Sequence, residues 1–200
     1  MKRITPDELA EMRARGFDRI LLEEASEAIQ RGKMADELIT LISEAFRGVT
    51  LGDGVGLQQA QGLDDYEDEE TCAAYREGDE KDDWRAIPSD ELNRCNSSLS
   101  FFDAEGMRFH LPAYMTAELR GEYGYGMSFC LTQLDAHGRT YFTALSEIQR
   151  QVVREFLLFI RDDPDYQFNR EAIDQSLESY WTAEGHSEST NAQQGGAQNP

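Results

Sequence analysis

The chain has 200 residues, 40% of them hydrophobic, which is enough for one compact core. Its 39 acidic residues outnumber the 19 Lys and Arg, and the formal net charge of −20 argues against unaided binding to nucleic acid or to an anionic membrane. The N-terminus carries no apolar segment typical of a signal peptide, and no apolar stretch is long enough to cross a bilayer. We therefore expect a cytoplasmic protein.

The N-terminal fifth has the pattern of helices. Thr5, Pro6 and Glu8 match a capping box with proline at the first helical position. Apolar residues at helical spacing follow, which favours helices in this part of the chain. Three glycines predict the ends of three separate helices: Gly16, Gly32 and Gly48.

Residues 51–91 are the most acidic part of the chain, with fourteen acidic residues against three basic ones. They begin in the Gly-rich segment 48–62, which lacks the features of a phosphate-binding loop and predicts an irregular loop. Asp64 and Asp65 start an acidic run without the spacing of a calcium-binding loop, so we interpret it as a solvated face. Trp84 is the expected anchor of this acidic region to the core.

Two hairpins are predicted in the middle of the chain. In "SSLSFFDAEGMRFHLPAYM", residues 97–115, apolar residues alternate on both sides of the turn signal "DAEG". Pro112 is expected to end the second strand and to begin a helix that stops at Gly121. Residues 127–145, "MSFCLTQL-DAHG-RTYFTAL", repeat the pattern. The predicted fold class is therefore α+β, a small antiparallel sheet of about four strands flanked by several helices.

Helices are expected on either side of this sheet. One covers residues 69–76 in the acidic region. Another starts at a capping box formed by Ser146 and Gln149, and Pro164 separates it from a last helix.

These patterns divide the chain into three parts. We expect a helical extension over residues 1–33, followed by a single α+β domain over residues 34–181 that contains the acidic loop region 51–91. The polar segment 182–200 cannot bury apolar surface, which predicts a disordered tail.

Cysteine and histidine are too scattered to indicate a metal site. The three cysteines, Cys72, Cys95 and Cys130, form no C-x-x-C pair. The three histidines do not complete a set with the spacing of zinc ligands. The sequence therefore predicts reduced, mostly buried thiols and no metal or other cofactor.

A group of polar side chains on the first predicted hairpin is the best candidate for chemistry. Across its ladder, Ser98, or alternatively Ser100, would face Arg108 or His110, so the hairpin would place a serine beside a histidine. No Gly-x-Ser-x-Gly nucleophile motif and no evident pair of oxyanion donors accompanies it. We interpret the three residues as a partly buried polar cluster, with a ligand-binding or catalytic site as the alternative.

Several distinctive segments resemble one known family. "FHLPAYM" within residues 97–115, the preceding Trp84 with its Ile-Pro, and "FTALSEIQRQVVREFL" resemble an uncharacterised bacterial family, the domain of unknown function DUF6714. The resemblance covers residues 38–160 and has Ser146 where the family more often has threonine. It implies a bacterial cytoplasmic protein and assigns no catalytic residues.

These observations favour a non-enzymatic interaction module that binds a basic protein through residues 51–91, in the manner of an acidic immunity or inhibitor protein. Negative charge is concentrated there, and no catalytic set is assembled in the sequence. Asp64, Asp65 and Trp84 are the candidate contact residues. The alternative is a small-molecule enzyme or ligand-binding domain with its site at the first hairpin, and mimicry of DNA by the acidic surface is a third, less favoured interpretation.

Overall fold

Every regular element in residues 3–182, the part of the chain that the computed structural model describes, is a helix. The α-helices are α1 (Pro6–Ala14), α2 (Arg19–Ala45), α3 (Leu57–Asp64), α4 (Glu69–Gly78), α5 (Ser89–Arg94), α6 (Ala104–Arg120), α7 (Ser128–Thr132), α8 (Glu147–Arg161) and α9 (Arg170–Ser179). Short 3₁₀ helices lie between them: η1 (Trp84–Ala86), η2 (Asn96–Ser100), η3 (Gly138–Phe142) and η4 (Pro164–Tyr166).

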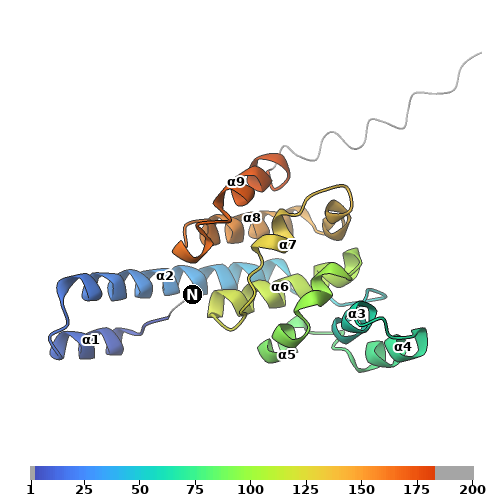
Figure 1. The fold of residues 1–200 in the computed structure, drawn as a ribbon, viewed down its shortest axis with the longest axis horizontal. Coiled ribbons are helices and arrows are strands. Elements are labelled where there is room, and N and C mark those ends of the chain that lie inside the picture. Colours follow the sequence, from blue (N-terminus) through green and yellow to red (C-terminus); the bar gives the residue numbers. More distant parts are fainter. Residues whose placement is uncertain (1–2, 183–200) are drawn as a thin grey trace, which may run out of the picture.

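The long helix α2 lies at the centre of this arrangement and contacts three other α-helices. It packs against both α6 and α8, while α1 folds back along its N-terminal half. The acidic helices α3 and α4 pack against each other at the opposite end of the molecule from α1 (Figure 1). One continuous cluster of buried apolar side chains extends from Ala35 on α2 to Trp181 just after α9.

The predicted α+β class is wrong, because residues 3–182 contain no strand and therefore neither hairpin nor sheet. The first predicted hairpin is replaced by η2 and by α6, which begins at Ala104 rather than at Pro112. Thirteen of the seventeen residues of α6 are buried. A helix that is apolar all round shows no 3.6-residue periodicity, so its buried residues were compatible with strand alternation.

The segment "DAEG", predicted as a hairpin turn, is instead the start of a helix. The Oδ1 atom of Asp103 accepts a hydrogen bond from the backbone N–H of Gly106 at 2.8 Å. This bond is made both in a tight turn and at a helix N-cap, and here it caps α6. Pro112 lies inside the helix, and the predicted helix end at Gly121 is confirmed by its left-handed φ of 75°.

The second predicted hairpin is also helical. Residues 128–132 form α7 and residues 138–142 form η3, with Asp135 between them. Asp135 Oδ1 accepts from the N–H of Gly138 at 2.7 Å, so the local hydrogen bond expected of "DAHG" forms without flanking strands. Buried side chains such as Leu131 and Phe142 fix these short helices on the core.

The Gly-rich segment is only partly the irregular loop that we predicted, because α3 begins within it at Leu57. Asp79 takes the place of a capping side chain: its carboxylate accepts from the N–H groups of Gln58 and Gln59 at 2.8 and 3.2 Å. A Cβ on Gly56 would collide with this carboxylate. The loop also crosses α6, where a Cβ on Gly54 would lie 2.6 Å from the backbone nitrogen of Gly106.

Several expected helix boundaries are confirmed. Thr5 and Ser146 each form a complete capping box, and the helix predicted at residues 69–76 is α4. The expected break at Gly32 does not occur, because α2 runs through it. The proposed division between residues 33 and 34 thus falls inside a continuous helix, and the expected tail beyond residue 182 lies outside the described residues.

Candidate functional site

The three polar residues expected on the first hairpin occupy unrelated environments. Ser98 is buried in η2, and its hydroxyl donates to the carbonyl oxygen of Leu57 at 2.9 Å. Arg108 is partly buried on α6 and lies 3.9 Å from the carboxylate of Glu105. His110 is fully buried on the same helix. In the described part of the chain, no hydrogen bond joins Ser98 to His110.

His110 has the surroundings of a core residue. Its Nδ1 atom lies 2.7 Å from the carbonyl oxygen of Gly106, and because that oxygen accepts, Nδ1 carries the proton. Its Nε2 atom is buried with no hydrogen-bond partner in residues 3–182. Burial lowers the pKa of His110 from 6.5 to about 4, so the ring is neutral at physiological pH. It is not placed to exchange a proton with solvent.

The acidic turn, defined here as residues 64–70 from the last residue of α3 to the start of α4, is the most exposed of the predicted contact regions. Asp64 is half-buried and Asp65 is exposed. Tyr66 follows them with a left-handed φ of 59°, and its side chain is 96% exposed. The N–H of Glu67 donates to the carbonyl oxygen of Gly62 at 2.9 Å, and that of Tyr66 to Leu63 at 3.3 Å. These two bonds form a Schellman motif with tyrosine at the position that usually holds glycine.

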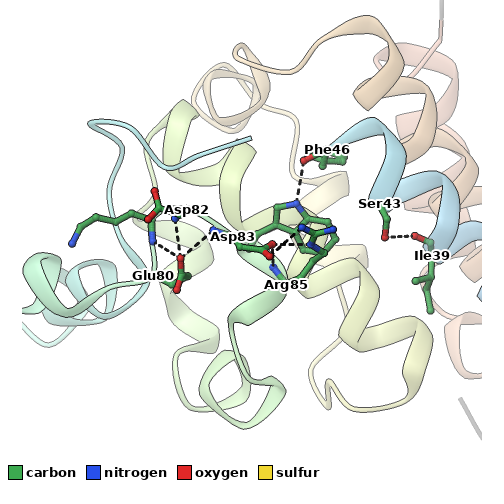
Figure 2. A network of polar contacts seen from close by, with 9 residues as sticks. Ile39, Ser43, Phe46, Glu80, Asp82, Asp83 and Arg85 are labelled. Atoms are coloured by element: carbon green, nitrogen blue, oxygen red, sulfur yellow. Dashed lines mark hydrogen bonds and ion pairs between the residues drawn. The ribbon is translucent and has the colours of Figure 1, made fainter. Parts of the chain in front are cut away.

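Trp84 anchors the end of the acidic region, as the sequence suggested. The side chain is buried, and its indole nitrogen donates to the carbonyl oxygen of Phe46 at the end of α2, at 3.2 Å. Beside it, Asp83 accepts two hydrogen bonds from the guanidinium of Arg85 at 2.7 and 3.0 Å. In Figure 2, Asp83 and Arg85 lie between Phe46 and the segment that contains Glu80 and Asp82.

Glu80 organises the backbone that leads into this anchor. Its Oε1 atom accepts from the N–H groups of Lys81, Asp82 and Asp83 at 3.0, 2.8 and 3.0 Å (Figure 2). These hydrogen bonds hold the pKa of Glu80 below its usual value. Part of the negative charge of residues 51–91 is therefore used to fix the chain.

Two cavities on another face were not anticipated from the sequence. They lie on either side of a wall made by the segment 123–129, which follows α6. The first has a volume of about 460 Å³. It is lined by η2, α7 and η3, with these side chains among others: Asn96, Ser97, Cys130, His137 and Tyr141.

The polar groups of the first cavity do not form a catalytic pair. The hydroxyl of Tyr141 donates to the carbonyl oxygen of Ser100 at 2.9 Å, so it accepts from Nε2 of His137 at 3.0 Å. That nitrogen is therefore a donor and is unavailable as a base. Burial raises the pKa of Cys130 to about 12, which keeps the thiol protonated and poorly nucleophilic.

The second cavity has a volume of about 510 Å³ and contains a buried carboxylate. Glu118, on α6, is 7% exposed, and its Oε2 atom accepts from the N–H of Met127 at 2.6 Å. Its other oxygen accepts from the hydroxyl of Tyr166. Gly126, with a φ of 77°, allows this approach, because a Cβ there would lie 2.7 Å from the Tyr166 oxygen.

The environment of Glu118 is electrostatically unusual. Burial raises the pKa of this carboxyl group from 4.5 to about 7, against the opposing effect of its two hydrogen bonds. A carboxyl group with a perturbed pKa inside a cavity is a typical mark of a binding or catalytic site. The sequence signal that could have identified it is "EYGYGM", residues 122–127, where glycines alternate with two tyrosines, the buried Tyr123 and the exposed Tyr125.

Other kinds of site find less support. No group of three or more His, Cys, Asp or Glu side chains in residues 3–182 is arranged to hold a metal ion. None of the helices described is long and apolar enough to cross a membrane.

The fold and these sites define a strongly acidic, all-helical protein with an exposed acidic turn and two aromatic-lined cavities. The model of the family described as "Family of unknown function (DUF6714)" matches residues 34–185, and the chain therefore belongs to this family. The resemblance stated for residues 38–160 is thus confirmed and extended. No curated protein and no solved structure matches the chain. A biochemical role must be inferred from the geometry.

Proposed function

We propose that the protein is a non-enzymatic interaction module that binds a basic protein partner through the acidic turn, residues 64–70, as an immunity or inhibitor protein would. The observation that carries this proposal is the position of Tyr66. Its aromatic side chain is 96% exposed and is flanked on both sides by acidic residues. Tyrosine side chains that become buried on binding are common energetic centres of protein interfaces.

The backbone at Tyr66 supports this role. A left-handed conformation costs a residue with a Cβ about 1–2 kcal/mol, and glycine avoids this cost. The side chain of Tyr66 recovers none of it through packing, because it is almost fully exposed. Folding alone would be served better by glycine at this position, so the tyrosine is better explained by binding.

The charge of the turn is also available to a partner. Asp64, Glu67, Glu69 and Glu70 form no ion pair within residues 3–182. The basic residue of α4, Arg76, donates instead to the carbonyl oxygens of Gly52 and Gly54 at 2.7 and 3.0 Å. Uncompensated surface charge of one sign accelerates association with a partner of the opposite sign.

A quantitative pull-down tests this proposal. The wild-type chain is compared with a variant that carries Asp65→Asn, Glu67→Gln and Tyr66→Gly, and captured proteins are measured at low and high salt. We expect a basic protein that the wild type retains at low salt, releases at high salt, and that the variant does not retain.

The matched control carries Glu24→Gln and Glu27→Gln, which remove two exposed charges from α2, far from the turn along the chain. This control should retain the partner. Identical capture by the wild type and the turn variant would overturn the proposal, and so would equal losses in the turn variant and the control.

A further inference from the structure

We propose that the cavity beside Glu118 is a binding site for a small organic cation, an alkylammonium group held between carboxylates and aromatic rings. This site lies apart from the acidic turn, and its evidence does not depend on the proposed interaction with a protein. The cavity lies between the end of α6, α7 and the segment 163–169 that leads into α9.

The charge of the lining is the first argument. Three carboxylate side chains line the cavity, and none of its described lining residues is Lys, Arg or His. From outside the lining, Arg3 donates to the carbonyl oxygen of Leu119. The carboxylates belong to Glu118, Asp163 and Asp165. Arg31 compensates one of them from outside the lining, because its Nε atom lies 3.1 Å from Asp163. Glu118 has only neutral partners, so the cavity retains negative charge that a cation can neutralise.

Unpartnered polar groups are the second argument. Ser128 on α7 is 6% exposed, lines the cavity, and its hydroxyl has no hydrogen-bond partner in residues 3–182. Tyr123 is 7% exposed and its hydroxyl likewise has no described partner. Neither hydroxyl oxygen is among the fully buried side-chain atoms without a partner, so both are accessible to a hydrogen-bonding ligand that enters the cavity. An ammonium N–H group would satisfy either oxygen.

The aromatic walls are the third argument. The rings of Tyr123 and Tyr125 lie 5.8 Å apart, and Phe129 stands beside them with its side chain 69% exposed. Tyr166 and Phe159 line the other side. Ring faces attract cations, and a set of such rings around a carboxylate is typical of sites for substituted ammonium groups.

The size and spacing of the groups favour an organic cation over a metal ion. The cavity of about 510 Å³ has the dimensions of a small-molecule site. Its carboxylates do not converge, since no cluster of three potential ligands in residues 3–182 could hold a metal ion. Burial raises the pKa of Glu118, and a cation bound beside it would favour the ionised form of this carboxyl group.

The proposal is tested by titrating the full chain with n-butylammonium chloride and following backbone amide signals by NMR. We expect saturable shifts at Gly126 and Ser128, with much smaller effects from potassium chloride or n-pentanol at equal concentration. Equal effects of these two probes, or no saturable shift with n-butylammonium, would overturn the proposal. A capped lysine amide in the same titration shows whether a lysine side chain can supply the ammonium group.

Two variants locate the site. Glu118→Gln preserves the shape of the carboxyl group and should weaken n-butylammonium binding by about tenfold or more, while Ser128→Ala should weaken it less. The matched control is Asp135→Asn, which removes one charge from the neighbouring cavity across the shared wall. If Asp135→Asn weakens binding as much as Glu118→Gln, the effect is general electrostatics and the proposed site is wrong. Thermal unfolding of each variant verifies that it is folded.

Discussion

The imidazole of His110 lies parallel to the ring of Phe102, with the ring centroids 4.4 Å apart and an angle of 4° between the planes. A second ring, that of Phe109, meets it edge-on at 5.0 Å. The histidine is thus packed as an aromatic core residue of α6, beside the point where the Gly-rich loop crosses the helix. This packing explains both its full burial and the low pKa of its side chain.

His110 makes stability depend on pH on the acidic side of neutrality. The unfolded chain takes up a proton near pH 6.5, whereas the folded chain does so only near pH 4. The contribution of His110 to stability is therefore complete above pH 6.5 and falls by up to about 3 kcal/mol as the pH drops towards 4. In His110→Leu this loss should disappear. Urea unfolding of both proteins at pH 7 and pH 5 measures it; parallel losses in both would contradict the assignment.

Glu118 should change stability in the opposite direction over an overlapping pH range. Its pKa is about 7 in the folded chain and near 4.5 when unfolded, so its penalty is absent below pH 4.5 and complete above pH 7. Glu118→Gln removes the charge and retains an oxygen for the N–H of Met127. We expect the variant to match the wild type at pH 5 and to exceed its stability by up to about 3 kcal/mol at pH 8. A constant difference across this range would be evidence against a raised pKa.

Two helical glycines provide a matched test of the crossing between the Gly-rich loop and α6. A Cβ at Gly106 would collide with the carbonyl oxygen of Val55, so Gly106→Ala should destabilise the protein by more than about 2 kcal/mol. A Cβ at Gly32 in α2 meets no atom within 4 Å. Gly32→Ala should therefore stabilise the protein by about 1 kcal/mol through helix propensity alone. Thermal unfolding under identical conditions compares the two, and the same sign for both would refute this account of the crossing.

The Schellman turn at Tyr66 gives a prediction that separates the backbone from the ring. Tyr66→Gly relieves the left-handed strain and should leave stability unchanged or raise it by up to about 1 kcal/mol. Tyr66→Ala also removes the exposed ring but retains the Cβ, so it should be less stable than the glycine variant. Chemical unfolding of the three proteins checks the order. A marked loss of stability in Tyr66→Gly would mean that the ring contributes to folding after all.

Several helix ends were predictable from the sequence because they depend on local hydrogen bonds, although the start of α6 and the continuity of α2 at Gly32 were not. The capping boxes at Thr5 and Ser146 and the left-handed Gly121 involve groups only a few residues apart, and all three are present. The identity of α6 was not predictable in this way. Its alternating apolar residues are explained only by α2, η1, η3 and α5, which cover it from several sides. When distant segments bury a helix from several sides, its own sequence does not show the periodic pattern of a helix with one buried face.

The candidate sites also differ in whether their residues are consecutive in the sequence or are brought together by the fold. The acidic turn could be found from composition, since its charge is a property of consecutive residues. The cavity at Glu118 could not, because Tyr166 and Glu118 are 48 residues apart and are joined by the fold. Conversely, Ser98 and His110 are close in sequence, yet η2 and α6 place no hydrogen bond between them.

The continuity of α2 has a consequence for how the protein can be divided. The family match begins at Met34, in the middle of this helix. The boundary of the family's sequence region therefore does not coincide with the start of a secondary-structure element. Cutting there would leave the N–H groups of a new first turn uncapped. It would also remove Arg31, which donates to Asp163 and to the carbonyl oxygen of Phe159 at 3.1 and 2.8 Å. A shortened chain for laboratory work should start no later than Asp18, whose carboxylate already caps α2 through the N–H of Leu21.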